Sequence, residues 1–274
     1  MARARVRWEG YRHRVASLTP VGESNSGGMG HSVLVLRGVM VLALLDLNAA
    51  VIGRCIGRRS GWWDVDEFEW SPRLQQAWPA MCEEISAHVE RRTIPSTAEL
   101  NGLVLDDGRT TDSIPDGEGM WRVLLLRSFG REVRANTQHF PATMAALEGV
   151  PVLANVGFSC LDPGSRIDEH RDPNRGALRY QLPLLIPEPV GSCRITVAAE
   201  QRVWEPGQPV LFDLHEPHHT ANEGTGPRVL LMFEILMPLP FGPSVLNRLA
   251  QWSYRMLPTY RGITTRADRL ATPA

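Results

Sequence analysis

The sequence predicts a mainly β fold, a sandwich or a barrel, with helices on its flanks. Short runs rich in β-branched and aromatic residues follow one another from Trp121 to Leu236, and turn sequences such as DPGS, DPNRG and EGTGP separate them. Six or seven such strands in about 115 residues suit an antiparallel sandwich or barrel. The helices that connect parallel strands are missing from this pattern, which disfavours a doubly wound parallel sheet.

The N-terminal region, residues 1–58, is expected to be a tail followed by an apolar segment. Its first part is polar and rich in Arg, Gly and Ser, so we expect no classical signal peptide. Residues 32–53 are as long as a membrane span, but Arg37, Asp46 and Asn48 interrupt them. Each charge at the centre of a spanning helix costs about 2.5–3.5 kcal/mol. We therefore expect a strand followed by a buried helix, with contact between this segment and a membrane as the alternative.

The central region, residues 59–242, is predicted to be one domain that begins with a helix. Between Ser71 and Val89, apolar residues recur at steps of three and four, which is typical of an amphipathic helix. Residues 93–119 are polar and rich in turn residues, so we expect an exposed loop, and residues 140–147 are predicted to be a short helix. The predicted strands are at residues 121–129, 152–161, 177–186, 192–199, 201–205, 208–214 and 228–236. The C-terminal region, residues 243–274, is predicted to be an amphipathic helix at 244–257 followed by a tail.

The composition excludes several classes of function and partner. All 29 basic residues are arginine, which excludes a lysine Schiff base and the lysine of a P-loop. The net charge of −1 gives no reason to expect nucleic acid as a partner. The four cysteines form no C-x-x-C pair, so neither a zinc ribbon nor a disulfide framework is expected, and the predicted location is the reducing cytoplasm.

His170 and Asp172 form an H-x-D motif that follows the turn sequence DPGSRIDE and precedes a predicted strand. In an extended segment, residues two apart point to the same side, so this imidazole and this carboxylate can face one point. A second imidazole from the distant segment LFDLHEPHHT would complete a set of two histidines and one carboxylate, which binds Fe(II) and leaves neighbouring coordination positions open. The alternative is structural: both side chains could pair with the loop backbone or with Arg171 and Arg175.

His218, in the distant segment, is followed ten residues later by Arg228 at the start of a predicted strand. A histidine that ends one strand and an arginine that opens the next can face one cavity, where the guanidinium binds a carboxylate with two hydrogen bonds. 2-Oxoglutarate fits such a site, because one end of it chelates iron and the carboxylate at its other end needs a cation. His219 would point to the opposite face of a strand and ranks second as the metal ligand. His215 lies in a turn, where it could contact substrate, and Asp213 is expected to hold the loop by hydrogen bonds.

Widely separated motifs between residues 62 and 240 agree in their spacing with one family pattern. They are Phe158-Ser159-Cys160-Leu161, Pro163-Gly164, His170 to Pro173, Gly176 to Leu182, Trp204, Gly207, Phe212-Asp213, His218 and Arg228. This set resembles the bacterial aspartyl/asparaginyl β-hydroxylase family, including its lipid A hydroxylase relatives. The resemblance implies that residues 59–242 form a double-stranded β-helix, the jelly roll that is also found in cupins.

The resemblance implies an iron site in which His170 and His218 are ligands. Animal members of the family have glycine where this chain has Asp172, whereas the lipid A hydroxylase branch has aspartate. We therefore expect the complete triad of His170, Asp172 and His218. The carboxylate also points to hydroxylation instead of halogenation, because halogenases of this class usually lack it.

The cosubstrate that the resemblance implies is 2-oxoglutarate. Arg228 would bind its distal carboxylate together with the hydroxyl of Ser159, and Arg179 would lie near its iron-proximal carboxylate. Gln181 replaces the histidine that the family has after Tyr180. Because glutamine can still donate a hydrogen bond, we expect the contact with the cosubstrate at this position to be retuned and not lost.

The expected reaction is hydroxylation of an unactivated C–H bond with Fe(II), 2-oxoglutarate and O₂. The preferred substrate is an amino-acid side chain, free, peptidyl or carrier-bound, that is hydroxylated at Cβ, in keeping with the family and with the arginine-rich loops. The alternative is the acyl chain of a lipid, which residues 33–53 and the C-terminal helix favour. An alternative from another class is a non-catalytic jelly-roll binding module.

Overall fold

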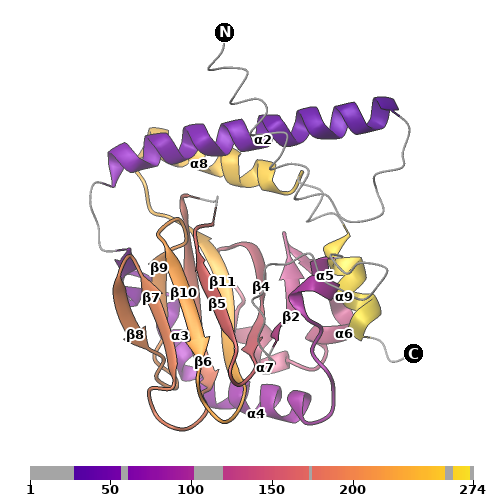
Figure 1. The fold of residues 1–274 in the computed structure, drawn as a ribbon, viewed down its shortest axis with the longest axis vertical. Helices are drawn as coiled ribbons and strands as arrows, with labels where there is room; N and C mark the ends of the chain where they lie inside the picture. Colours follow the sequence, from indigo (N-terminus) through magenta and orange to yellow (C-terminus); the bar gives the residue numbers. More distant parts are fainter. Residues whose placement is uncertain (1–27, 57–60, 102–119, 173–174, 257–261, 272–274) are drawn as a thin grey trace.

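The computed structural model describes residues 28–56, 61–101, 120–172, 175–256 and 262–271. Within these ranges the chain forms two antiparallel sheets with helices around them (Figure 1). The strands are β1 (Trp62–Trp63), β2 (Trp121–Ser128), β3 (Arg131–Glu132), β4 (Val152–Leu161), β5 (Arg166–His170), β6 (Ala177–Leu185), β7 (Cys193–Val197), β8 (Glu200–Val203), β9 (Val210–Asp213), β10 (His218–Asn222) and β11 (Arg228–Leu236). The helices are α2 (Gly28–Cys55), η1 (Val65–Glu67), α3 (Ser71–Gln76), α4 (Trp78–Val89), α5 (Thr97–Asn101), α6 (Arg134–Thr137), α7 (Pro141–Ala146), α8 (Phe241–Tyr254) and α9 (Ile263–Ala271).

From β4 to β11 the chain crosses repeatedly between the two sheets, and only β7 and β8 follow one another within one sheet. The larger sheet has the order β1-β9-β6-β11-β4-β2-β3, and the smaller sheet has the order β5-β10-β7-β8. The chain therefore passes from β4 in the larger sheet to β5 in the smaller sheet, back to β6, across to β7 and β8, and so on to β11. This winding is a double-stranded β-helix, which confirms the predicted fold class.

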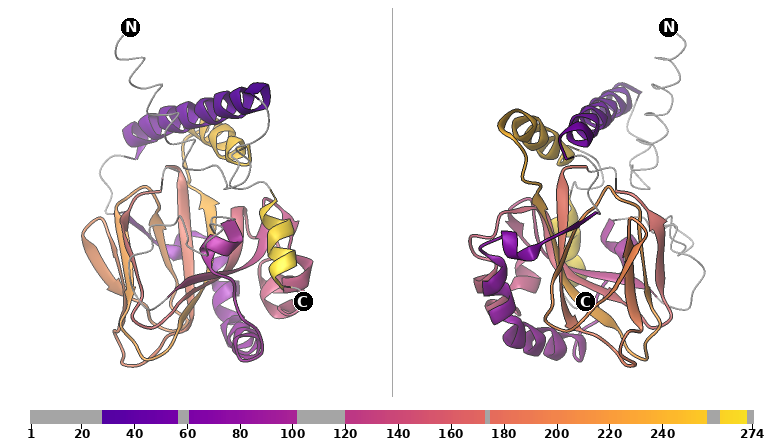
Figure 2. Two further views of the ribbon diagram at one scale, coloured as in Figure 1. Left: turned by 45° about the vertical axis from the view of Figure 1, so that its right-hand side comes forward. Right: turned by 90° about the vertical axis from the view of Figure 1, so that its left-hand side faces the viewer.

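The larger sheet is buried on both faces, which explains the near-continuous apolar runs of β4, β6 and β11. Helices α3, α4 and α7 cover its outer face, as Figure 2 shows, and Leu74, Met81 and Ile85 join the core there. The inner face meets the smaller sheet around a second cluster that includes Trp204 and Phe212. The functional residues predicted from the sequence lie in or next to the strands of this interior.

The prediction for residues 32–53 was wrong, because a single helix, α2, runs through the whole segment. Asn48 does not interrupt it: the side chain is fully buried, and its amide nitrogen donates hydrogen bonds to the Arg175 carbonyl and to Asn247 Oδ1. Six leucines and three alanines favour a helix in this segment, against five valines, which favour a strand. Of the predicted N-terminal tail, residues 1–27 lie outside the described residues.

Several boundaries differ from the prediction for local reasons. The helix expected from Ser71 to Val89 is divided into α3 and α4, with Ala77 as the cap between them and Pro79, which lacks an amide hydrogen, in the first turn of α4. Helix α5 lies in the segment predicted to be a loop, of which residues 102–119 are outside the described residues. Helix α9 lies in the predicted tail. Strands β5 and β10 were not predicted, because polar side chains dominate both.

Candidate metal and cosubstrate site

His170 and His218 are cross-strand partners at one end of the smaller sheet. His170 ends β5, His218 begins β10, and the two residues are paired in the register of these strands. Their ring centroids lie 4.2 Å apart. The prediction that His218 ends a strand was therefore wrong, because His218 begins β10. Antiparallel pairing of the start of β10 with the end of β5 brings the two imidazoles together.

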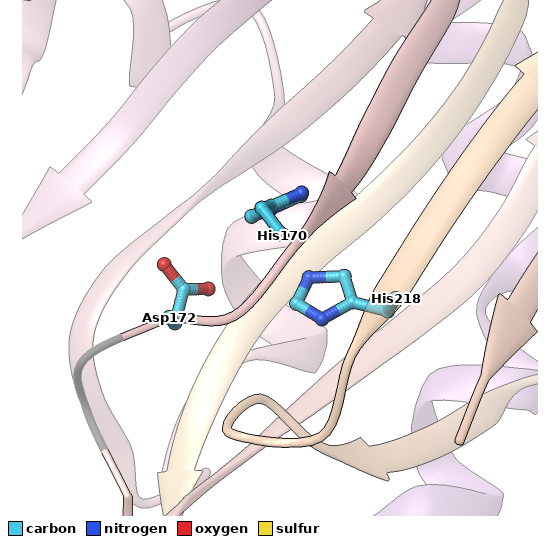
Figure 3. A group of neighbouring side chains, drawn as sticks. All are labelled: His170, Asp172 and His218. Atoms are coloured by element: carbon cyan, nitrogen blue, oxygen red, sulfur yellow. The ribbon is translucent and has the colours of Figure 1, made fainter.

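Asp172 joins the two histidines from the loop that follows β5 (Figure 3). One ligand atom from each of the three residues lies within 4.8 Å of the other two. The loop is fixed from behind, because the Asp172 amide donates to the Leu214 carbonyl and the ring of His215 hydrogen-bonds to the Asp172 carbonyl at 3.0 Å. The structure thus brings together the three residues that were predicted as the triad.

The histidine side chains are oriented by backbone carbonyls. His170 Nδ1 lies 2.8 Å from the Asp168 carbonyl, and His218 Nδ1 lies 2.9 Å from the Glu216 carbonyl. Because a carbonyl oxygen only accepts, each Nδ1 carries a hydrogen, and in a neutral ring Nε2 then has the lone pair. His218 Nε2 is buried and has no hydrogen-bond partner in the described part of the chain. A divalent metal ion would satisfy this nitrogen.

Burial keeps His218 neutral. Removal from water is the main cause that lowers the pKa of its imidazole to about 4, and the nearby Arg179 and His170 lower it further. The hydrogen bond to Glu216 and the carboxylate of Asp172 act in the opposite direction. A neutral imidazole is the form that binds a metal, so the site is prepared for a ligand at neutral pH.

Two nitrogen donors and one carboxylate on one side of a point fit the facial ligand set of Fe(II), which suits a metal that must also bind cosubstrate and O₂. Arg179, on β6, links this set to the larger sheet. Its Nη2 atom lies 3.4 Å from Asp172 Oδ2 and 2.9 Å from Glu234 Oε1. Glu234 is the cross-strand partner of Arg179 on β11, and burial raises the pKa of its carboxyl group while the guanidinium lowers it.

Arg228 forms the second part of the site, at the start of β11. Its side chain is only 1% exposed, and its guanidinium lies 4.6 Å above the ring of Trp204. Nη2 donates to Ser159 Oγ at 3.2 Å, and Nη1 donates to Thr220 Oγ1 at 3.3 Å. Burial lowers the pKa of Arg228 to about 10, so the side chain is still a cation at neutral pH.

This buried cation has no ion pair with an acidic side chain among the described residues, and its Nε atom has no hydrogen-bond partner there. An uncompensated buried charge is costly, so the arrangement fits a site that is completed by an anionic ligand. Thr220 is two residues from His218 on β10, a separation of about 7 Å along a strand. A dicarboxylate of five carbons could therefore extend from the triad to Arg228.

The other predicted residues fall into two groups. Gln181 is buried and faces Met232 on β11, where its Nε2 lies 3.9 Å from the Met232 sulfur and its side-chain oxygen has no hydrogen-bond partner in the described residues. His219 is not part of the triad: it is exposed and its Nδ1 lies 3.9 Å from a carboxylate oxygen of Glu169. Asp213 accepts a hydrogen bond from the His215 amide, as predicted for a loop-holding residue.

A cavity of about 270 Å³ reaches the triad from the side of β2, α5 and α9. Asp172, Arg179 and Glu234 line its polar part. The other walls are largely apolar and include Leu100, Trp121, Val123, Leu125, Met232 and Ile263. Sequence reasoning missed this cavity and the Arg179–Glu234 pair. A signal for the pair exists, since Glu234 is the one acidic residue in the apolar run RVLLMFEIL.

Comparisons with known proteins find hydroxylases that resemble this chain. The family model of Aspartyl/Asparaginyl beta-hydroxylase matches residues 75–238. An ornithine lipid ester-linked acyl 2-hydroxylase from Rhizobium tropici is 28% identical over 178 residues, which are 65% of this chain and 60% of that protein. Human aspartyl/asparaginyl beta-hydroxylase is 26% identical over 147 residues, 50% of this chain and 19% of that protein. The chain thus spans 60% or less of these two relatives.

A prolyl-4-hydroxylase structure from Pseudomonas putida aligns with 18% identity and a TM-score of 0.36. The alignment covers 72% of this chain and 99% of that structure. A 2OG-Fe(II) oxygenase family structure from Burkholderia pseudomallei aligns with 13% identity and a TM-score of 0.33. That alignment covers 44% of this chain and 73% of the structure. Similarity at this level carries no weight for function. The family match extends over more than half of the chain, so the protein belongs to the aspartyl/asparaginyl β-hydroxylase family.

Proposed function

We propose that the protein is an Fe(II)- and 2-oxoglutarate-dependent dioxygenase that hydroxylates an unactivated C–H bond. The observation that carries this proposal is the pairing of two half-sites in one barrel. One is the compact group of His170, Asp172 and His218, and the other is the buried cation of Arg228 without an acidic partner among the described residues. A non-catalytic jelly-roll module has no need for both.

Each side chain has a defined task in this proposal. His170 and His218 present Nε2 to the metal, and Asp172 supplies the negative charge. Arg228 and the Ser159 hydroxyl bind the distal carboxylate of 2-oxoglutarate. When bound, iron and 2-oxoglutarate supply the oxidising chemistry for C–H hydroxylation, and the protein controls which carbon lies beside it.

Arg179 and Gln181 would complete the cosubstrate pocket from β6. The two residues are two apart on one strand and therefore face the same interior. The ion pair of Arg179 with Glu234 holds the guanidinium beside Asp172, from where it can reach the iron-proximal carboxylate. The amide of Gln181 can donate to the cosubstrate in place of the family's histidine.

For the substrate we propose an acyl chain of a lipid. The apolar walls of the 270 Å³ cavity, built by β2, α5 and α9, favour an aliphatic chain over a charged one. The Rhizobium tropici relative is named for hydroxylation of an acyl chain. Hydroxylation at Cβ of an amino-acid residue, expected from the sequence, is the second candidate, and Asp172, Arg179 and Asn155 in the cavity are polar groups that could orient such a substrate.

We further propose a cytoplasmic location, on the cysteine pattern described above, with O₂ and a small-molecule, lipid or peptide substrate as partners. The test of the function is anaerobic loading with Fe(II) and 2-oxoglutarate, followed by measurement of succinate after O₂ is added. Acyl lipids, free amino acids and peptides are supplied separately, and mass spectrometry detects a gain of one oxygen atom. Stimulation by acyl lipids alone supports the preferred substrate, and stimulation by amino acids or peptides alone supports Cβ hydroxylation.

The matched variants are Asp172→Ala and His219→Ala. The first removes a proposed ligand, whereas the second removes an exposed histidine one residue from a proposed ligand. Succinate release that is absent with Fe(II) and 2-oxoglutarate under every condition, or that survives in Asp172→Ala as in the wild type, would falsify the proposal.

A further inference from the structure

Helix α8 has its polar and apolar faces exchanged relative to an ordinary surface helix. Of the four described side chains of α8 that are buried, three are polar: Asn247, Gln251 and Ser253 are at most 3% exposed, and the fourth is Ala250. Its solvent-facing residues are large and apolar, with Phe241 at 87% and Trp252 at 53% exposure. They recur at helical steps along one stripe: Phe241, Val245, Leu249, Trp252 and Met256.

Helix α2, which packs against α8, is apolar on both faces. Val39, Leu42 and Leu45 form a buried cluster with Ala250 of α8. The outer face should be polar in a helix that meets water, yet its exposed residues are also apolar at steps of three and four: Leu36, Met40, Ala43, Leu47 and Ala50. Figure 1 shows that the two helices lie together across one end of the barrel. A layer with this pattern requires a second apolar environment.

The exposed charges on this layer have one sign, and Asp46 of α2 is half-buried. Among the described side chains of α2, α8 and the residues that directly follow α8, the exposed charged ones are Arg54, Arg248 and Arg255. Arg255 lies over the ring of Trp252, with 5.4 Å from its guanidinium carbon to the ring centroid. Arginine beside tryptophan and aliphatic side chains is typical of helices that lie in the interfacial region of a bilayer.

The layer is attached to the loop that carries Asp172. Asn48 of α2 and Gln251 of α8 each donate to the Arg175 carbonyl, at 3.0 and 3.3 Å. Asn247 of α8 donates to the Gly176 carbonyl at 2.8 Å. A Cβ at Gly176, whose φ is +101°, would come within 2.3 Å of the Asn247 side chain, so only glycine fits there. The polar face of α8 is therefore used to hold the triad end of the barrel.

We propose that α2 and α8 together form a docking surface for a bilayer that contains anionic phospholipids, with both helices in the plane of the interface. Helix α2 is long and apolar enough to span a membrane, over Gly38–Cys55. However, a spanning orientation would separate Asn48 from both of its buried partners, which favours the planar one.

A second copy of the chain is a poorer occupant of this surface than a bilayer. A symmetric dimer would bring Arg54, Arg248 and Arg255 of one copy toward those of the other, whereas anionic headgroups attract all three. The docking surface stands on these exposed side chains and needs no catalysis. If the surface binds a bilayer, an acyl chain would enter the site from the membrane at the triad end, and this part of the inference rests on the proposed function.

Vesicle flotation of the full-length protein tests the surface directly. The vesicles are phosphatidylcholine, with or without phosphatidylglycerol, and the expected result is flotation with the anionic vesicles that weakens at high salt. Leu249→Glu/Trp252→Glu should lower the partition coefficient at least about tenfold, because two large apolar side chains lose their buried environment. Arg248→Gln and Arg255→Gln should each lower it about fivefold, and on anionic vesicles only.

The control is Val190→Glu, which places the same charge on an apolar side chain that is 89% exposed, in the connection between β6 and β7 and outside α2 and α8. It should float as the wild type does. The proposal is wrong if the wild type remains with neither kind of vesicle, or if Leu249→Glu/Trp252→Glu floats unchanged. It is also wrong if light scattering shows a dimer that this double variant converts to a monomer, since the surface would then bind a second copy.

Far-UV circular dichroism and Co(II) binding establish that each variant is folded. Vesicle binding and succinate release are separate measurements, so the two proposals can fail separately. A protein that floats without 2-oxoglutarate turnover keeps the docking surface and loses the enzyme. One that releases succinate with a soluble substrate but does not float keeps the enzyme and loses the surface.

Discussion

The two halves of the candidate site are built in opposite ways. The metal half, on the smaller sheet, is partly open: His170 is exposed and Asp172 is half-buried, and only His218 is buried. The carboxylate half, on the larger sheet, is closed around Arg228, one of the largest fully buried side chains of the protein. The difference matches two requirements. A metal that binds substrate and O₂ beside it needs access, whereas a cation that selects one dicarboxylate works best out of water.

The two halves are also held in place differently. Backbone carbonyls two residues earlier orient both histidine rings, so their geometry depends on local strand structure. Side-chain hydroxyls from β4 and β10 hold Arg228, so its geometry depends on the packing of two sheets. Substitutions in the metal half should therefore act mainly on metal binding. Those in the carboxylate half should act on 2-oxoglutarate and leave the metal in place.

The largest expected effect is that of His218→Ala. Substitution of residues that only support a metal ligand costs 10- to 100-fold in metal affinity, so loss of a ligand should exceed about 100-fold and remove turnover. Co(II) absorption measures binding, and succinate release measures activity. His219→Ala, the exposed neighbour, is the matched control and should behave as the wild type. Equal losses in the two variants would show that His219 contributes to the site.

Arg228→Met should act on the cosubstrate alone. Truncation of one partner of a buried charge pair costs about 2–5 kcal/mol, or about 30- to several thousand-fold in 2-oxoglutarate affinity. Metal affinity should not change. The variant without ligand should be as stable as the wild type or more stable, because a buried cation without an acidic partner among the described residues has been replaced by an apolar side chain.

Thermal unfolding with and without 2-oxoglutarate measures both effects of Arg228→Met. The control is Arg202→Met, because Arg202 also lies over a tryptophan, Trp62, at 4.2 Å but is largely exposed. The wild type and Arg202→Met should be stabilised by 2-oxoglutarate, and Arg228→Met should not be. Stabilisation of all three would place the dicarboxylate elsewhere.

The sequence could predict the two halves because each depends on short spacings. His170 and Asp172 are two apart, and strong apolar runs mark β4, β6 and β11. Strands β5 and β10 could not be predicted, since their polar side chains face solvent or the site and give no alternating pattern. For the same reason the position of His218 within its strand was predicted wrongly.

Contacts that depend on register between distant strands were beyond sequence reasoning. Arg179 and Glu234 become cross-strand partners only because β6 and β11 pair with one particular offset. The continuity of α2 was missed because valines in the first half of residues 32–53 favour a strand. The burial of Asn48 within that helix could not be predicted either. Its partners, Arg175 and Asn247, are 127 and 199 residues away. Burial of a polar residue is predictable only when its partners are known.

Asn48→Leu should have an intermediate effect, because it tests how far the metal half depends on the helices above it. The Arg175 carbonyl and Asn247 Oδ1 each lose one of two donors, because Gln251 Nε2 still donates to both. The loss of each hydrogen bond costs about 0.5–1.5 kcal/mol of folding stability. Because the Arg175 loop also carries Asp172, Co(II) affinity should fall severalfold while 2-oxoglutarate binding by Arg228 is retained. Gln138→Leu, which removes an exposed amide from the Ala135 carbonyl, is the control. If Asn48→Leu is destabilised but binds Co(II) as the wild type does, the position of Asp172 does not depend on α2 and α8.

The smallest expected effect is that of Ser159→Ala in the carboxylate half. The Ser159 hydroxyl accepts from Arg228 at 3.2 Å and from Trp121 Nε1 at 3.0 Å, so its loss leaves the guanidinium in place but less well oriented. One net hydrogen bond is worth about 0.5–1.5 kcal/mol, which predicts a two- to tenfold rise in KM for 2-oxoglutarate with kcat little changed. Ser128→Ala is the matched control, since Ser128 is equally buried and its hydroxyl has no partner among the described residues. If Ser159→Ala instead lowered Co(II) affinity, the two halves would be coupled through β4, and their independence would be wrong.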